Sequence, residues 1–254
     1  EGAEFSLEAD PRVTKPRHLQ TLAKLGFRRL SLGIQDFDPK VQDIVHRVQS
    51  EDQVRAVTET AREFGYESIN YDLIYGLPQQ TEAALCKTVQ ECIAMKPDRI
   101  VLFGYAHVPW MAKNQRMIDE AALPGAEERA TQARSSAQAL IDGGYEPIGI
   151  DHFALPGDTL TKAMESGKLH RNFQGYTDDD ARALIGFGAT AIGRTPFGYM
   201  QNQSETGAWA RAIEAGHLPV AKGHVMSVDD CLRAYVIERI MCDGEIDLEA
   251  AGGF

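Results

Sequence analysis

The stretch SINYDLIYGLP, residues 68–78, decides the fold of this 254-residue chain. Residues 68–75 are rich in apolar side chains, which is typical of a short, largely buried β-strand. The turn formers at 76–78 end that strand, and Thr81 can cap a helix whose apolar side chains share one face. The stretch therefore predicts one strand–turn–helix unit.

The same unit recurs before and after this stretch. Residues 29–35 alternate apolar and polar side chains, and the region after them contains an Asp38-Pro39 helix start and a capping box at 50–53. Strands that alternate with helices predict parallel β–α units, and hence an α/β sheet or barrel. The predicted strands are 3–9, 29–35, 68–75 and 99–106, and the first helix is 16–25.

The second half of the chain is less regular. Residues 107–123 have little periodicity and form a long connection. We therefore divide the chain into 1–123 and 124–254. The later segment predicts helices at 124–140, 159–166, 205–216 and 228–241, a fifth strand at 145–153, a stretch at 169–177 that is neither helix nor strand, and a glycine-rich stretch at 185–193.

Polar side chains stand on strands that are otherwise apolar. Glu8, Asn70 and Asp72 lie there, with Gln35 and His107 at strand ends. Burying a carboxylate without a partner is costly, and parallel sheets carry their chemistry at the carboxyl ends of their strands. Each residue alone could cap a nearby helix, but the coincidence on successive strands favours a shared site.

Composition excludes several classes of protein. There are 26 basic and 37 acidic residues, and the formal net charge of −11 argues against a general nucleic-acid binder or a polybasic membrane-surface protein. No apolar run approaches the ~20 residues of a membrane span. The four cysteines match no metal-site spacing, so we interpret them as small buried side chains in a reducing compartment, the cytoplasm.

Other site patterns are weak. Asp151-His152 with His170 could ligate a metal, but no metal spacing repeats. A serine hydrolase would need a nucleophile elbow, and a sugar-phosphate barrel enzyme would need a phosphate-binding glycine loop at a helix start, which the chain lacks. Arg171 between aromatic residues suits a flat carboxylated ligand, although a polar surface loop has the same composition.

Six segments together resemble one family of enzymes. The sequence is similar to the oxygen-independent coproporphyrinogen III oxidases, radical S-adenosylmethionine enzymes of haem biosynthesis, in order and over essentially the whole chain. LHRNFQGYT is the most specific of these segments, because related haem-binding chaperones on the same scaffold lack it. The segments are EFSLEADP (4–11), LSLGIQDFD (30–38), INYDLIYGLP (69–78), FGYAHVPW (103–110), GIDHFALPGD (149–158) and LHRNFQGYT (169–177).

The resemblance implies a fold and a cofactor site. The fold would be the later strands of a partial six-stranded (β/α)6 barrel, followed by an α+β substrate-side segment. Glu8 and Asp72 would hold S-adenosylmethionine, and Gln174 and Ile192 would lie over the substrate or a second S-adenosylmethionine. The rest of the implied pocket is Gln35, Arg47, Ile74 and Ala106.

The family reaction converts two propionates of coproporphyrinogen III to vinyl groups, giving protoporphyrinogen IX. A reduced four-iron–four-sulfur cluster cleaves S-adenosylmethionine to a radical that takes a hydrogen from the propionate, and an electron donor and an acceptor take part. His152, His170, Arg171 and Gln174 are the implied substrate contacts. The resemblance assigns no catalytic residue, and a monomer is expected.

One departure from the family is large. The C-x3-C-x2-C loop that binds the cluster is absent, and the strand at 3–9 corresponds to the third strand of the family barrel. We therefore expect a fragment that has no metal ligands of its own and is inactive alone. The alternative function is that of a haem-binding chaperone on the same scaffold.

Overall fold

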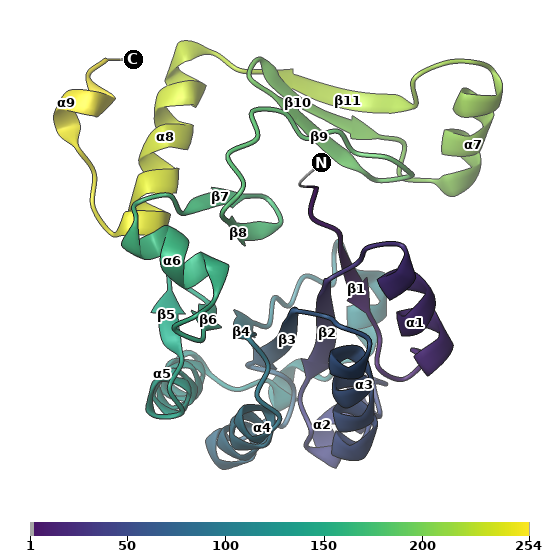
Figure 1. The fold of residues 1–254 in the computed structure, drawn as a ribbon, viewed down its shortest axis with the longest axis vertical. Helices are drawn as coiled ribbons and strands as arrows, with labels where there is room; N and C mark the ends of the chain where they lie inside the picture. Colours follow the sequence, from purple (N-terminus) through teal and green to yellow (C-terminus); the bar gives the residue numbers. More distant parts are fainter. Residues whose placement is uncertain (1–2, 254) are drawn as a thin grey trace. The chain divides into compact units, whose positions relative to one another are not determined.

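The computed structural model describes residues 3–253, and the chain divides into two compact units, Glu1–Glu165 and Ser166–Phe254 (Figure 1). The division after residue 123 that the sequence suggests stays a prediction. Among the described residues, no helix has both the length and the apolar character needed to cross a membrane.

The first unit is built on a six-stranded sheet with the order β1-β2-β3-β4-β6-β5. Its first four strands pair in parallel, which confirms the predicted α/β class. Helices follow the strands in the predicted alternation (Figure 1). The elements are β1 (Ser6–Ala9), α1 (Pro16–Lys24), β2 (Arg29–Gln35), α2 (Pro39–Ile44), α3 (Glu51–Glu63), β3 (Ser68–Tyr75), α4 (Glu82–Ala94), β4 (Arg99–Gly104), the short 3-10 helices Lys113–Met117 and Glu120–Ala122, and α5 (Ala126–Asp142).

The two faces of this sheet differ in chemistry. On β3, Ile69, Tyr71 and Leu73 are fully buried in the core that the helices cover, whereas Asn70 and Asp72 point to the opposite face. Successive side chains of a strand alternate between faces, so one face can be dry and the other polar. The polar face is therefore where the first unit can offer chemistry.

The predicted helix caps are confirmed. Ser50 Oγ accepts a hydrogen bond from Gln53 N at 3.2 Å, and Thr81 Oγ1 accepts one from Ala84 N at 3.2 Å. Asp38 caps α2 through Lys40 N at 2.9 Å. These caps satisfy backbone donors that a helix start otherwise leaves without partners.

The fifth strand predicted at 145–153 is wrong. The segment forms a hairpin of β5 (Glu146–Ile148) and β6 (His152–Ala154), and β6 pairs antiparallel with both β5 and β4. Gly149 has φ +59°, a left-handed conformation that breaks the strand in its middle. The parallel order therefore ends at β4, and α6 (Thr159–Glu165) closes the unit.

The second unit contains short antiparallel strands. The stretch 169–177, expected to be neither helix nor strand, is a hairpin of β7 (His170–Asn172) and β8 (Gly175–Thr177). The expectation of an irregular stretch was wrong because strands of three residues are too short to show a period in the sequence. A three-stranded sheet and three helices complete the unit: β9 (Ile192–Thr195), β10 (Gly198–Asn202), α7 (Thr206–Glu214), β11 (Val220–Val225), α8 (Val228–Asp243) and α9 (Leu248–Ala251).

Candidate functional site

Neighbouring strands bring four polar side chains to the polar face of the first sheet. Glu8 lies opposite Ser31, and Ser31 lies opposite Asn70, in the registers of β1, β2 and β3. Asn70 Nδ2 donates to Asp72 Oδ1 at 2.8 Å and to Ser31 Oγ at 3.0 Å, and Ser31 Oγ donates to Asp72 Oδ2 at 3.2 Å. Glu8 and Asp72, predicted as cofactor contacts, therefore share one surface.

The electrostatics of this cluster leave room for a ligand. Burial raises the pKa of Asp72 above its usual range, hydrogen bonds from Asn70 and Ser31 oppose the rise, and the nearby charge of Glu8 adds to it. The side-chain oxygen Oδ1 of Asn70 is buried and has no hydrogen-bond partner. A buried acceptor without a partner costs free energy, so a ligand that donates hydrogen bonds would be stabilised here.

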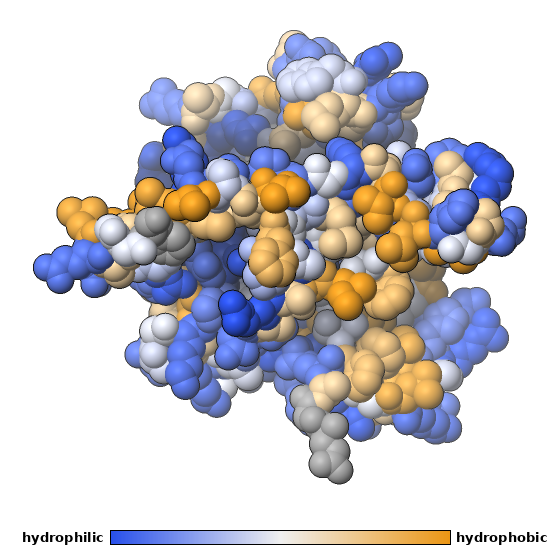
Figure 2. All heavy atoms as spheres, turned by 90° about the horizontal axis from the view of Figure 1, so that it is seen from above, coloured by the Kyte–Doolittle hydropathy of each residue, from blue (hydrophilic) through white to orange (hydrophobic). Residues whose placement is uncertain are grey.

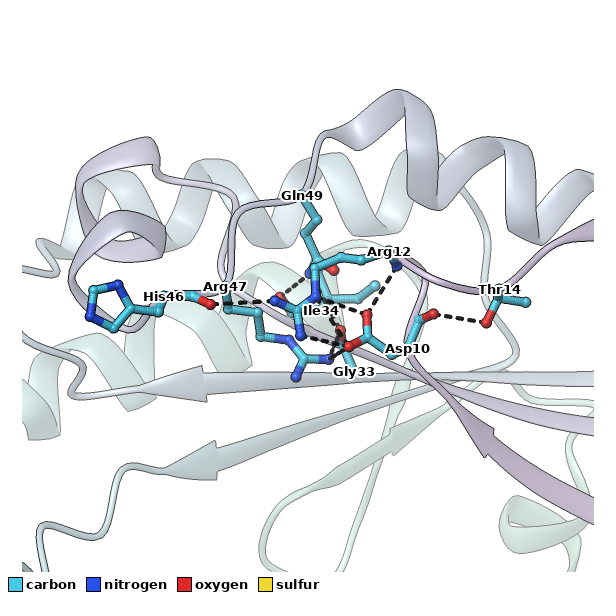
Figure 3. A network of polar contacts seen from close by, with 8 residues as sticks. All are labelled: Asp10, Arg12, Thr14, Gly33, Ile34, His46, Arg47 and Gln49. Carbon is cyan, nitrogen blue, oxygen red and sulfur yellow. Dashed lines mark hydrogen bonds and ion pairs between the residues drawn. The ribbon is translucent and has the colours of Figure 1, made fainter. Parts of the chain in front are cut away.

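A second polar network lies at the carboxyl end of β2 (Figure 3). Arg47 Nη2 donates to the carbonyl of Gly33 at 2.9 Å and lies 3.9 Å from Asp10 Oδ2. Burial lowers the pKa of Arg47, while Asp10 raises it. Its Nε is buried without a partner, so the guanidinium group keeps a donor for an anionic ligand.

The carboxylate of Asp10 also forms hydrogen bonds with a second arginine, Arg12. Arg12 Nη2 and Nε donate to its carboxylate at 2.6 Å and 3.0 Å, and Arg12 Nη1 reaches the carbonyl of His46 at 3.3 Å (Figure 3). The hydrogen bond from Arg12 lowers the pKa of Asp10 to about 2. Asp10 therefore hydrogen-bonds to Arg12 and forms a longer ion pair of 3.9 Å with Arg47. The sequence analysis missed this pair, although Asp10-Pro11-Arg12 directly after a strand end is a usable signal.

Gly33 makes space for the predicted cofactor contacts around it. A Cβ at Gly33 would lie 2.7 Å from Arg47 Nη2 and 2.9 Å from Gln35 Nε2. Gln35 has φ +67°, and the register between β2 and β3 shifts between Gly33 and Gln35. The chain therefore folds Gln35 and Arg47 together over a residue that has no side chain.

Buried glutamines hold the next strand end in place. Gln80 Nε2 donates to the carbonyl of Ile74 at 2.8 Å and to Asp36 Oδ2 at 2.6 Å. Its Oε1 accepts from Gly76 N at 2.7 Å, where Gln132 Oε1 also accepts, at 3.0 Å. This network links the ends of β2 and β3, and sequence reasoning missed it because nothing local marks Gln80 as buried.

Two further predicted residues lie away from these networks. Ala106 is exposed beyond β4, which ends at Gly104 rather than at 106 as predicted, and its carbonyl accepts from Gln115 Nε2 at 3.0 Å. His152 lies on β6, where Nδ1 is 2.7 Å from Asp151 Oδ1 and the ring packs edge-on against Phe103 at 6.2 Å between centroids.

The predicted substrate residues of the second unit lie on the β7–β8 hairpin. His170 Nδ1 is 2.9 Å from Glu238 Oε1 on α8, and the backbone N of Arg171 donates to the same oxygen at 3.4 Å. The guanidinium of Arg171 stacks over the ring of Tyr176 at 4.5 Å, and Tyr176 Oη donates to the carbonyl of Met241 at 2.9 Å. These contacts fix the hairpin on α8.

The last two predicted residues belong to different surfaces of the second unit. Gln174 is exposed at the hairpin turn, where its backbone N donates to Asn172 Oδ1 at 2.8 Å. Ile192 on β9 lines a hollow of about 300 Å³, together with Phe173, Tyr199 and other residues of the three-stranded sheet. The hollow is mainly apolar, which suits a ring or a hydrocarbon.

The described cysteines do not fit an iron–sulfur cluster. Cys92 and Cys242 are buried, and burial raises the pKa of both thiols, that of Cys242 to about 11. Cluster ligands are thiolates, whereas burial favours the thiol form of Cys92 and Cys242. Across residues 3–253, no group of three His, Cys, Asp or Glu side chains could hold a metal ion.

Comparison with known proteins shows a similarity to one superfamily of enzymes. The model of the radical SAM superfamily matches residues 1–92, which include β1, β2, β3 and the polar face described above. The first 92 residues are therefore similar to the radical SAM superfamily. Of the implied S-adenosylmethionine contacts, this match includes Glu8, Gln35, Arg47, Asp72 and Ile74.

Similarity to individual radical SAM proteins extends over nearly the whole chain. Coproporphyrinogen III oxidase, anaerobic 1, of Cereibacter sphaeroides is 46% identical over 98% of this chain and 55% of its own length. The oxygen-independent coproporphyrinogen III oxidase of Paracoccus denitrificans is also 46% identical, over 98% of this chain and 55% of its own length. The chain thus spans about half the length of these curated relatives.

A solved structure supports the fold. Coproporphyrinogen III oxidase from Escherichia coli, described as a radical SAM enzyme, superposes with a TM-score of 0.94 at 39% identity. The superposition covers 99% of this chain and 58% of that one. The later strands of a radical SAM barrel, expected from the sequence, are therefore the fold of this chain.

Proposed function

We propose that this chain is part of an oxygen-independent coproporphyrinogen III oxidase and that the carboxyl ends of β1, β2 and β3 bind S-adenosylmethionine. The observation that carries the proposal is a pair of buried polar atoms without partners, Asn70 Oδ1 and Arg47 Nε, within the segment that matches the radical SAM superfamily. A zwitterionic nucleoside ligand offers both donors and a carboxylate to such atoms.

Each side chain has a role that its chemistry supports. Asp72 and Glu8 accept hydrogen bonds from ribose hydroxyls and the amino group, and Arg47 donates to the methionine carboxylate. Gln35, Ile74 and Ala106 complete this pocket, while Gln174 and Ile192 contact the substrate or a second S-adenosylmethionine.

The substrate is coproporphyrinogen III, which carries four carboxylates. Arg171 and His170 anchor a propionate, and His152 and Gln174 make further contacts. When bound beside a reduced cluster, S-adenosylmethionine would supply the radical chemistry that removes a hydrogen from the propionate. The residues of this chain position the two ligands and exclude water, as is usual where cofactors supply the reactive chemistry.

The cluster is not held by the cysteines of this chain. Two of the four thiols are buried and the cysteine spacing does not match a cluster loop, so we expect these 254 residues by themselves to bind ligands without turnover. Anaerobic reconstitution with iron and sulfide should give no cluster absorbance and no cleavage of S-adenosylmethionine. Turnover additionally requires an electron donor and an acceptor.

Calorimetric titration with S-adenosylmethionine tests the cofactor site. Asp72→Asn should weaken binding about ten-fold, since hydrogen bonds to a charged group are worth about 1.5–3 kcal/mol. Asp142→Asn is the matched control, because Asp142 is exposed at the end of α5 and should leave affinity unchanged. Circular dichroism of both variants checks the fold.

Two outcomes would overturn the proposal. One is a wild-type chain that does not bind S-adenosylmethionine, and the other is equal affinity in Asp72→Asn. Titration with haem separates the alternative: stoichiometric haem binding without affinity for coproporphyrin III would indicate a haem-binding chaperone.

A further inference from the structure

A second hollow in the second unit, of about 270 Å³, is lined by three arginines. Arg171 comes from β7, Arg194 comes from β9, and Arg182 comes from the segment between β8 and β9. Guanidinium groups repel one another, so a hollow that collects three of them is suited to an anion.

The backbone brings these arginines together from distant positions. Leu184 and Arg194 exchange two backbone hydrogen bonds of 2.8 Å each, as an isolated antiparallel bridge. This bridge places the segment that carries Arg182 beside β9. Arg171 is fixed separately, through the contacts of the hairpin with Glu238 and Tyr176.

Acidic side chains also line this hollow, and two of them are already engaged. Glu238 accepts from His170 and from the backbone of Arg171, and Asp179 Oδ1 accepts from Ala181 N at 2.8 Å. Asp180 also lies at the hollow. Within residues 3–253, the guanidinium groups of Arg182 and Arg194 form no hydrogen bond or ion pair. Their donors are therefore available to a ligand.

The neighbouring hollow supplies the other half of a ligand site. Phe173 lines both the arginine-lined hollow and the mainly apolar hollow that contains Ile192 and Tyr199. A ligand that joins a ring to a short carboxylate side chain could place its ring against the apolar residues and its carboxylate among the arginines. Pyrroles that carry carboxyalkyl groups have this chemistry.

We propose that Arg182 and Arg194, together with Arg171, form a carboxylate subsite that takes a propionate of the tetrapyrrole substrate. The proposal rests on the proposed function for the identity of the substrate, and it adds two binding residues that the family resemblance did not supply. A guanidinium fork pairs with a carboxylate through two parallel hydrogen bonds, which a lysine cannot reproduce.

Binding of coproporphyrin III, the air-stable oxidised form of the substrate, tests the subsite. Its affinity for the whole chain is measured by fluorescence titration for Arg182→Gln and Arg194→Gln. Each variant should weaken binding about ten-fold, which corresponds to about 1.4 kcal/mol. Arg194→Lys should recover only part of the loss.

Arg233→Gln is the matched control. Arg233 is exposed on α8, pairs with Asp229 at 2.6 Å and carries the same charge. Its loss should change coproporphyrin III affinity by less than about two-fold, which separates a local subsite from a general effect of net charge. The affinity for S-adenosylmethionine should be unchanged in all of these variants.

The outcomes distinguish this proposal from the function on which it rests. Wild-type affinity for coproporphyrin III in both glutamine variants would overturn the subsite and leave the S-adenosylmethionine site standing. A wild-type chain that binds S-adenosylmethionine but not coproporphyrin III would also overturn the subsite. Failure of S-adenosylmethionine binding would instead remove the proposed function.

Discussion

The two units of the chain differ in where their apolar side chains lie. In the first unit, one continuous core joins the helices to one face of the sheet, with members from Leu19 to Phe153. In the described part of the second unit, Phe187, Phe197 and Leu218 are 80–89% exposed, and β11 is exposed along its length. Figure 2 shows exposed hydrophobic side chains among hydrophilic ones on one face of the molecule.

This difference teaches that the two units owe their structure to different forces. Burial of apolar area stabilises the first unit. The second unit depends more on individual polar contacts, such as those that join the β7–β8 hairpin to Glu238 and Met241 of α8. The same kind of substitution should therefore have unequal effects in the two units.

The largest effect is expected from a matched pair of leucines. Leu73→Ala removes a fully buried side chain from β3 and should lower the free energy of unfolding by about 3 kcal/mol. Leu218→Ala removes a side chain that is 86% exposed and should change it by less than about 0.5 kcal/mol. Urea denaturation followed by circular dichroism measures both, and similar losses would show that Leu218 is covered in solution.

Helix caps should stabilise the two units equally, because a cap acts only on its own helix start. Ser50 caps α3 in the first unit, and Ser227 caps α8 in the second through Asp230 N at 3.1 Å. Alanine at either position should cost about 1 kcal/mol. The same denaturation measurement applies, and a loss more than about three times larger at one cap would contradict a purely local role.

The smallest expected effect is that of acid pH on stability. As the pH falls, the contributions of Asp72 in the first unit and of Asp230 in the second should change in opposite directions. Burial raises the pKa of Asp72, so its unfavourable ionisation in the folded state is relieved as the pH falls through that raised value. Hydrogen bonds from Ser227 lower the pKa of Asp230 from 3.8 to about 2, so its stabilising contribution is lost as the pH falls from 3.8 toward 2.

Carboxyl carbon shifts in an NMR titration measure both midpoints, with Asp72→Asn and Asp230→Asn as assignments. The midpoint of Asp72 should lie above 3.8 and that of Asp230 near 2. A midpoint of Asp72 below 3.8 would mean that hydrogen bonds from Asn70 and Ser31 outweigh burial.

Sequence periodicity was sufficient for the longer parallel strands of the first unit and insufficient for the short hairpins of both units. The predicted bounds of β2 and β3 match the structure, because seven or eight residues that alternate between a core and a polar face leave a readable pattern. The hairpins β5–β6 and β7–β8 have strands of three residues each, and the turns that begin at Gly149 and at Phe173 decide them. A pattern cannot show a period over three residues.

The candidate site divides in the same way. Asp72 and Glu8 could be predicted because carboxylates on apolar strands are conspicuous. The contact of Gln80 with Asp36 could not, since it joins residues 44 positions apart that carry no local mark. The closer approach of Arg12 than of Arg47 to Asp10, at 2.6 Å against 3.9 Å, depends on side-chain reach, which sequence alone does not give.

The absence of a side chain at Gly33 links this position to position 47 of the sequence. Any side chain at 33 would occupy the volume that the Arg47 guanidinium now fills, because the added carbon would lie 2.7 Å from Nη2. Gly33 and Arg47 should therefore covary: in relatives with a larger residue at the first position, the second should no longer be a long cation. In such chains, a residue other than 47 would have to bind the proposed ligand carboxylate.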